Sequence, residues 1–258
     1  MRVALGVEYN GTSFCGWQTQ DGARTVQACV EQALTRVADH PVKVIAAGRT
    51  DAAVHAAGQV VHFDTTAVRS ERSWVFGANT HLPHDVSVLW ACPVSEDFHA
   101  RFSARARHYR YVILNRAVRP ALLNARVSWY YRPLDAARMS AAAAYLLGEH
   151  DFSSYRALAC QAKSPVRTVH RLDVTRHGEL VVIDIAANAF LHHMVRNIAG
   201  VLMSIGSGEH EPVWAREVLE ARDRTLGGVT APPQGLTLMA VEYPEAFGLP
   251  QPPAPVIL

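Results

Sequence analysis

The chain has 258 residues, of which 49% are hydrophobic and 19% are charged, and its formal net charge is only +2. This length allows one large domain or two small ones, and the composition is that of a folded protein rather than a disordered one. The first residues lack the apolar core of a signal peptide, and no apolar run reaches the ~18 residues of a membrane span, so we expect neither secretion nor membrane insertion.

The four cysteines are far apart in the sequence and form no CxxC pair. They are Cys15, Cys29, Cys92 and Cys160. This spacing favours reduced thiols over a disulfide or zinc framework, and we therefore predict a cytoplasmic protein.

The first part of the chain shows a β-α-β-β-α-β order of predicted elements. The pattern predicts a strand at 3–9, a helix from Thr25 as its N-cap, strands at 42–47 and 58–64, a helix near 70–78 and a strand near 86–94. The two-residue alternation of apolar side chains marks the strands, and the repeat of three to four residues marks the helices.

The same order recurs after an arginine-rich joint. We expect a strand at 107–114, a helix at 135–147 between Asp135 and Gly148, strands at 166–175 and 179–187, helices at 190–205 and 212–222, and a strand at 236–243. Apart from one additional helix this is a second β-α-β-β-α-β unit. We predict an α+β fold of two ferredoxin-like (split βαβ) halves, whose antiparallel sheets join across a central cleft. The halves would comprise 1–103 and 104–244, followed by an irregular proline-rich tail at 245–258.

Nearly all the positive charge of the chain is arginine, and it concentrates in HARFSARARHYRYV (99–112). Guanidinium groups bind phosphates and stack on bases, and aromatic rings stack on unpaired bases. The segment therefore predicts contacts with nucleic acid. Two alternatives stay open: a coding bias toward arginine, and a solvated edge strand with cationic side chains that prevent aggregation. The residues concerned are Arg101, Phe102, Arg105, Arg107, Tyr109, Arg110 and Tyr111.

The stretch AAGRTDAAVHAAGQVVHF (46–63) connects two predicted strands and places Arg49 and Asp51 among alanines and glycines. A carboxylate with an ordinary pKa near ~3.9 is ionised at neutral pH and can act as a nucleophile without an activating base. A nearby cation would hold it charged and oriented, and Arg196 in FLHHMVRNIAG is a candidate. The pattern alone equally allows a capped turn at Asp51, and it favours a surface position for Arg196.

The sequence lacks the usual signals of metal and cofactor chemistry. The chain has 13 histidines, but the adjacent His192 and His193 would diverge by ~100° on a helix. His55 and His62 have no carboxylate at a recognised ligand spacing. Walker A, GxGxxG and GxSxG motifs do not occur, and we predict neither a metal nor a cofactor.

Several segments, in order along residues 3 to about 243, resemble the tRNA pseudouridine synthase A family. GRTDAAVHAAGQVVHF is similar to that family's signature GRTDAGVHAxGQVxHF. The other segments are VEYNGTSFCGWQTQ (7–20), FHARFSARARHYRYVILN (98–115), SPVRT (164–168), FLHHMVRNIAG (190–200) and APPQGLTL (231–238). The resemblance thus covers nearly the whole chain.

The resemblance implies an enzyme that isomerises uridine to pseudouridine in the anticodon stem-loop of tRNA, at positions 38 to 40, as a homodimer with the duplicated fold. By motif position, Asp51 is the nucleophile, Arg49 helps to extrude the target base, Tyr109 packs on the flipped uracil and Arg196 pairs with Asp51. A base must leave the stack before its bond to the sugar can be exchanged. The other residues expected to contact the RNA are Arg105, Arg107, Arg110 and His55.

Two positions depart from the family pattern. Ala53 replaces a glycine, which would cost about 1 kcal/mol if the backbone there needs a positive φ. Asn10 replaces an aspartate but keeps a turn-forming side chain. Two other functions remain as alternatives: a catalytically silent RNA-binding relative with the same fold, and a metal-dependent hydrolase.

Overall fold

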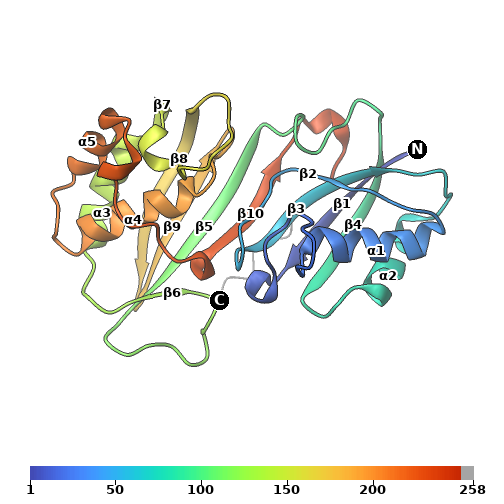
Figure 1. Cartoon of the computed structure of the whole chain (residues 1–258), viewed down its shortest axis with the longest axis horizontal. Coiled ribbons are helices and arrows are strands. Elements are labelled where there is room, and N and C mark those ends of the chain that lie inside the picture. The colour runs from blue at the N-terminus through green and yellow to red at the C-terminus, as the bar shows by residue number, and fades with distance from the viewer. Residues whose placement is uncertain (251–258) are drawn as a thin grey trace. The chain divides into compact units, whose positions relative to one another are not determined.

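The structure is a computed structural model that describes residues 1–250. It consists of two compact units, one formed by Met1–Ala106 together with the chain from Thr237 onward, the other by Arg107–Leu236 (Figure 1). Each unit is a mixed α/β structure with a mostly antiparallel sheet and few helices. The last part of the predicted tail, 251–258, lies outside the described residues.

The strands of the first unit follow the order β4-β1-β3-β10, and the short β2 pairs with β3. β1 is antiparallel to both β3 and β4, and β10 runs parallel to β3. Its elements are β1 (Arg2–Tyr9), α1 (Val26–Ala38), β2 (Ile45–Ala46), β3 (His55–Asp64), α2 (Glu71–His81), β4 (Val86–Val94) and β10 (Leu236–Glu242, from Thr237 onward).

Helices α1 and α2 lie side by side and pack against each other (Figure 1). Gly77 of α2 permits this approach, because a Cβ there would lie 3.0 Å from the side chain of Val37. Trp74 of α2 is buried and meets the ring of Phe63 on β3 edge-on, with the ring centroids 5.1 Å apart. Thr25 occupies the predicted N-cap position of α1, but its side chain makes no capping hydrogen bond.

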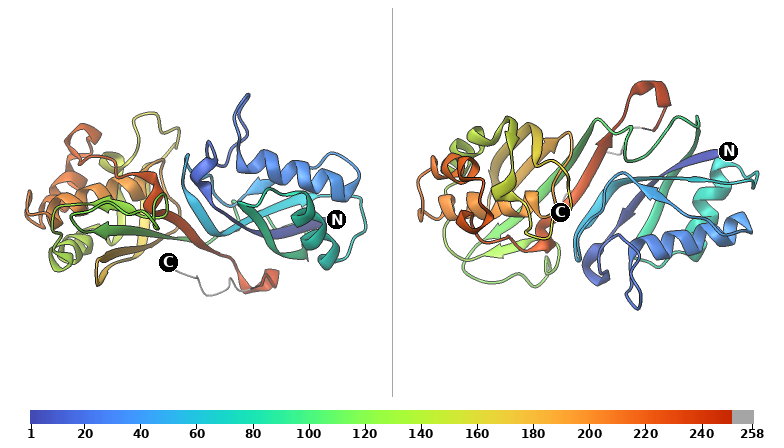
Figure 2. Two further views of the ribbon diagram at one scale, coloured as in Figure 1. Left: turned by 90° about the horizontal axis from the view of Figure 1, so that it is seen from below. Right: turned by 45° about the horizontal axis from the view of Figure 1, so that its top comes forward.

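The second unit has the strand order β5-β9-β8-β7, all antiparallel, with β6 parallel to β5. Its elements are β5 (Ala106–Asn115, from Arg107 onward), β6 (Ser128–Tyr130), α3 (Ala136–Ala143), β7 (Gly148–Asp151), β8 (Val166–His177), β9 (Leu180–Ala187), α4 (Met194–Gly206) and α5 (Trp214–Ala221). The three helices pack together, as the views of Figure 2 show. Asp135 caps α3 as expected, accepting hydrogen bonds from the amides of Ala137 and Arg138.

The structure differs from the sequence expectations in several places. The strands β6 and β7 were not expected, and the helix expected at 135–147 ends at Ala143. The last strand, expected in the second half, groups with the first unit, because Thr237 and Leu238 pair with β3. The strand expected at 42–47 shortens to Ile45–Ala46. The helix expected from 190 begins only at Met194, because His193 adopts a left-handed conformation with φ 63°. Among residues 1–250, no helix is long and apolar enough to cross a membrane.

Candidate active site

Asp51 lies on the loop of residues 47–54 between β2 and β3, which we call the Asp51 loop. The Asp51 side chain is half-buried and Arg49 is exposed. The segment after η1 (Gly11–Ser13) braces the loop backbone: the amide of Trp17 donates to the carbonyl of Thr50 at 3.0 Å. The amide of Ala53 donates back to that segment, to the carbonyl of residue 14 at 3.3 Å. The Asp51 loop is therefore held by a segment that precedes it by more than thirty residues.

Two glycines allow this close approach. A Cβ at Gly11 would lie 2.0 Å from the carbonyl oxygen of Val54, and one at Gly16 would lie 2.7 Å from that of Thr50. Gly16 also has a positive φ of 86°. The amide of Gly11 donates to Nδ1 of the buried His55 at 3.0 Å. His55, predicted to contact RNA, thus takes part in bracing the loop.

The inner side of the Asp51 loop meets buried polar side chains that sequence reasoning missed. The hydroxyl of Tyr9 lies 2.7 Å from Oγ1 of Thr50. Gln59 donates through Nε2 to the carbonyl of Gly48 at 2.7 Å. Burial raises the pKa of Tyr9 to about 12, so its phenol stays protonated at neutral pH. Tyr9 and Gln59 both lie in the quoted motifs, but each is an ordinary residue type for a strand.

Both departures from the family pattern have a structural counterpart. Ala53 has φ 62°, the left-handed conformation that favours glycine. Asn10 acts as the N-cap of the turn at Gly11–Ser13, and its side-chain oxygen accepts from the amide of Thr12 at 3.2 Å. The first replacement therefore costs free energy, whereas the second preserves the turn.

In the second unit, Arg196 lies in the first turn of α4 and is half-buried. Its Nε donates to the carbonyl of Ala231 at 2.8 Å, and the amide of Ala231 donates to the carbonyl of Arg196 at 3.1 Å. The neighbouring Asn197 is buried and accepts from the hydroxyl of Thr230 at 2.7 Å. The FLHHMVRNIAG and APPQGLTL segments thus meet at Arg196. Its pairing with Asp51, a residue of the other unit, stays a prediction.

The predicted RNA-binding residues of β5 are engaged by their own unit. Arg110 forms a two-pronged ion pair with Asp184 on β9, with distances of 2.7 and 2.9 Å. Arg107 is buried and donates through Nη1 to the carbonyl of Asn188 at 2.7 Å. These contacts give both arginines a structural role.

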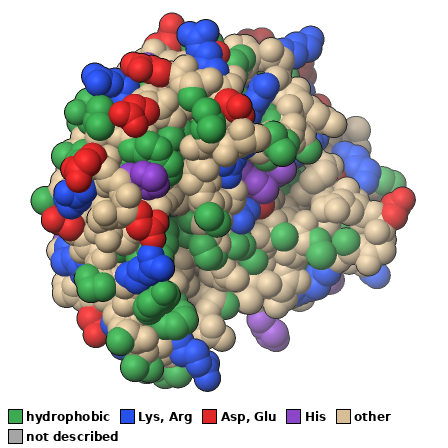
Figure 3. All heavy atoms as spheres, turned by 60° about the vertical axis from the view of Figure 1, so that its left-hand side comes forward, with side chains coloured by type: hydrophobic (Ala, Val, Ile, Leu, Met, Phe, Trp, Pro, Cys, Tyr) green, Lys and Arg blue, Asp and Glu red, His purple; other side chains and the backbone are tan. Residues whose placement is uncertain are grey.

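The aromatic residues of β5 are buried as well. Tyr109 meets the ring of Phe190 edge-on, with the centroids 5.0 Å apart. The hydroxyl of Tyr111 donates to the carbonyl of Pro232 at 2.8 Å. In contrast, the preceding Arg105, in the first unit, is exposed. On the face that Figure 3 shows, basic side chains are interspersed with acidic ones rather than gathered in one area.

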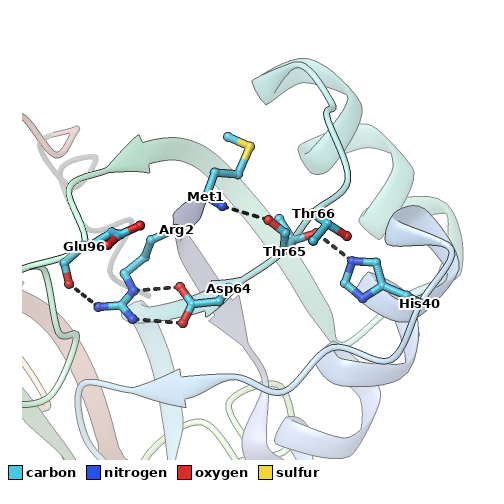
Figure 4. Close-up of a pocket in the computed structure, with 7 residues that line it drawn as sticks. All are labelled: Met1, Arg2, His40, Asp64, Thr65, Thr66 and Glu96. Atoms are coloured by element: carbon cyan, nitrogen blue, oxygen red, sulfur yellow. Dashed lines mark hydrogen bonds and ion pairs between the residues drawn. The ribbon is translucent and has the colours of Figure 1, made fainter.

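A separate cavity of about 630 Å³ in the first unit lies against the N-terminus (Figure 4). Its lining residues are Met1, Arg2, His40, Asp64, Thr65, Thr66 and Glu96. Arg2 is held by both oxygens of Asp64 at 2.9 Å, and the N-terminal amine donates to the carbonyl of Thr65. Arg2 and Asp64 are therefore paired with each other, and none of the lining residues belongs to the Asp51 loop.

Comparison with known proteins identifies the family. A family model described as tRNA pseudouridine synthase matches residues 6–103 and 142–244. The chain belongs to the tRNA pseudouridine synthase family. It is 66% identical over 256 residues to a protein of Nitrosococcus oceani named tRNA pseudouridine synthase A, and the match covers 99% of both chains. Membership in this family makes the chain an isomerase.

Two further relatives carry the same name. The protein of Alcanivorax borkumensis is 60% identical over 253 residues, which cover 98% of this chain and 95% of the relative. The protein of Coxiella burnetii is 58% identical over 252 residues, which cover 98% of this chain and 97% of the relative. The similarity therefore extends over both units.

Proposed function

We propose that the protein isomerises uridine to pseudouridine in the anticodon stem-loop of tRNA, at positions 38, 39 and/or 40, with Asp51 as nucleophile. The observation that carries this proposal is the Asp51 loop itself. It presents a half-buried carboxylate on a backbone braced by two closely packed glycines, in a chain of the tRNA pseudouridine synthase family. Directly after Asp51 the side chains of Ala52 and Ala53 are small, which leaves room for a flipped nucleotide.

The chemistry requires only groups that the chain itself provides. The bond from the sugar to a ring nitrogen is exchanged for a bond to a ring carbon, so the product has the same atoms as the substrate. An ionised aspartate can form a covalent adduct with the target nucleotide while the bond from the sugar to the ring nitrogen breaks. The base stays in the site, turns and bonds to the sugar through a ring carbon; the proton lost from that carbon is balanced by one gained at the ring nitrogen, and the aspartate is released. The reaction neither consumes an oxidant nor transfers an external group, and the proposal therefore includes neither metal nor cofactor.

Other residues receive the roles that the family resemblance assigns. We propose that the exposed Arg49 helps to extrude the base, that Tyr109 packs on the flipped uracil and that Arg196 pairs with Asp51. Arg105, also exposed, remains our candidate for a phosphate contact. The contacts of Arg107, Arg110 and His55 support structural roles, as described above.

The proposal includes the finer architecture and assembly. The first unit has the strand order β4-β1-β3, with β2 paired to β3, and its helices α1 and α2 lie side by side. This order supports a ferredoxin-like arrangement for the first unit. We propose the same arrangement for the second unit, with a central cleft, and a cytoplasmic homodimer. Light scattering of the purified protein tests the dimer, since a monomeric mass at micromolar concentration would remove that part.

The function is tested by comparing the wild type with Asp51→Asn on unmodified tRNA that carries uridine at positions 38 to 40. The RNA is digested and the nucleosides are separated chromatographically, because uridine and pseudouridine have equal mass. We expect turnover to fall by roughly 10³-fold or more while tRNA binding persists. Asp97→Asn, the same exchange at an exposed carboxylate of the same unit, should retain full turnover.

Each alternative predicts a different result. Pseudouridine formation by Asp51→Asn at the wild-type rate would contradict the nucleophile. Binding of several such tRNAs without modification by the wild type would favour a silent RNA-binding relative. RNA hydrolysis that stops on addition of a chelator would favour a metal-dependent hydrolase.

A further inference from the structure

The backbone of the Asp51 loop is tied on both sides of Arg49 to one buried group of polar side chains. Thr50, directly before Asp51, is buried and lies 2.7 Å from the hydroxyl of Tyr9. On the other side, the carbonyl of Gly48 accepts from Gln59 at 2.7 Å. Tyr9 and Gln59 lie on the paired strands β1 and β3. Together their two contacts form a buried polar network that fixes residues 48 and 50.

Burial makes this network stiff. Tyr9 is 4% exposed and Gln59 is fully buried, so water cannot replace a lost partner. A buried polar group without a partner is costly, and connected groups therefore favour one arrangement over all others. Gln59 is itself oriented, because its Oε1 accepts from the amide of Val60 at 3.2 Å.

A backbone hydrogen bond constrains the loop independently of this network. The carbonyl of Thr50 accepts from the amide of Trp17 at 3.0 Å, so Thr50 is held through both its side chain and its backbone. The next residue in the chain is Asp51, whose Cα therefore has little freedom. A carboxylate that attacks one atom of a bound nucleotide benefits from this restriction, since a displacement of about 1 Å can cost ~10²-fold in rate.

We propose that Tyr9, Thr50 and Gln59 are positioning residues that hold Asp51 in the orientation needed for attack. This inference rests on the proposed function and adds a buried group that does not itself touch the RNA. It predicts that the network contributes to kcat and not to tRNA binding. The phenol acts as a neutral hydrogen-bonding group, so its contribution is constant across neutral pH.

The test compares Tyr9→Phe, Thr50→Val and the double variant with the wild type on the same tRNA. Each single variant should lower kcat by ~10- to 100-fold and change KM less than ~3-fold. Because both changes break the same hydrogen bond, kcat of the double variant should lie no more than ~3-fold below kcat of the less active single variant. Thr50→Ser keeps the hydroxyl and should restore kcat to within ~3-fold of the wild type.

Tyr155→Phe is the matched control for lost stability. Tyr155 is fully buried in the second unit and donates its hydroxyl to the carbonyl of Ala215 at 2.9 Å. Its loss should lower the melting temperature by an amount comparable to Tyr9→Phe and leave kcat unchanged. Equal losses of kcat in Tyr155→Phe and Tyr9→Phe would overturn the positioning role. A wild-type kcat in Tyr9→Phe would also overturn it. So would a loss of kcat in the double variant equal to the product of the two single losses.

Asp51→Asn in the same assays separates the two proposals. If Asp51→Asn is inactive and Tyr9→Phe is fully active, only the positioning role fails. If Asp51→Asn turns over at the wild-type rate, the proposed function of Asp51 fails, whatever the buried network does.

Discussion

The Asp51 loop and strand β5 use their charged residues in opposite ways. The loop keeps Arg49 exposed and Asp51 half-buried, while its backbone is held by neighbouring segments. β5 presents a denser array of arginine and aromatic side chains, yet Arg107 and Arg110 are bound by the carbonyl of Asn188 and the carboxylate of Asp184. Backbone hydrogen bonds hold the loop in place, whereas contacts of the arginine side chains stabilise the strand.

This difference shows that residue type alone does not reveal which arginines are held by intramolecular contacts. An arginine within a sheet can pair with an opposite charge on the neighbouring strand, and the register of β5 with β9 places Arg110 opposite Asp184. A loop has no such neighbour in register, so its charged side chains can remain available for a ligand. The contrast is consistent with the chemistry that we propose for the loop, and it indicates a stabilising role for the two arginines of the strand.

The strongest test of the contrast is Arg110→Leu, which leaves Asp184 without its ion-pair partner. Arg110 and Asp184 are 17% and 25% exposed, so we expect the free energy of unfolding to fall by about 2–3 kcal/mol in urea titrations. Turnover per folded molecule should stay within ~3-fold of the wild type. The contrast would be wrong if Arg110→Leu left the free energy of unfolding unchanged and raised the Kd for tRNA instead. Arg105→Leu, at an exposed arginine, is the matched comparison.

A second test lies at the far end of the GRTD-containing segment, at His62. This buried histidine accepts from the amide of Ala100 through Nδ1, and burial, with help from Arg2 and His99, lowers its pKa to about 4. The unfolded chain, with an ordinary histidine pKa near ~6.5, takes up the proton first as the pH falls. The stabilisation is therefore present above pH ~6.5 and is lost as the pH falls toward 4.

We expect His62→Gln to remove about 1–2 kcal/mol of the difference in unfolding free energy between pH 7 and pH 4.5. Urea titrations at the two pH values measure this difference, which also includes the contribution of the carboxylates. His177→Gln, at an exposed histidine, should leave it as in the wild type. If the unfolding free energy of His62→Gln depended on pH as in the wild type, the proposed contribution of His62 to stability would be wrong.

The smallest expected effect concerns the backbone of the Asp51 loop. Ala53 has φ 62°, and glycine adopts this conformation without the steric cost of a Cβ. Ala53→Gly should therefore raise the free energy of unfolding by roughly 0.5–1 kcal/mol in urea titrations. Ala57→Gly, the same exchange within β3, should lower it by a similar amount. A destabilised Ala53→Gly would mean that relief of strain in the loop does not offset the entropy of glycine.

Local sequence patterns predicted most of the helices and strands but not the contacts between segments far apart in the sequence. The strand at 86–94 and the capping of α3 by Asp135 follow from neighbouring residues alone, and both are confirmed. The membership of β10 in the first unit depends on pairing with β3, far away in the sequence. Alternation of residue types within one segment cannot contain that information. The same holds for the two hydrogen bonds that hold Tyr9 to Thr50 and Gln59 to Gly48.

Candidate site residues divide in the same way. Asp51 and Arg49 stood out because charges among alanines and glycines are unusual, and this is a local signal. The engagement of Arg107 and Arg110 could not be seen locally, because their partners lie 81 and 74 residues later. The positive φ at Ala53 was anticipated only through the glycine of the family pattern.

The bracing of the Asp51 loop by residues 9–17 also bears on the order of folding events. The contacts of Tyr9 with Thr50 and of Gly11 with His55 span 41 and 44 residues. Such non-local contacts require closure of a long loop and form after local helices. A nascent or partly unfolded chain therefore carries the aspartate but not the geometry around it. The nucleophile that we propose becomes competent only when β1 and β3 have paired, which couples the onset of the proposed chemistry to completion of the first unit.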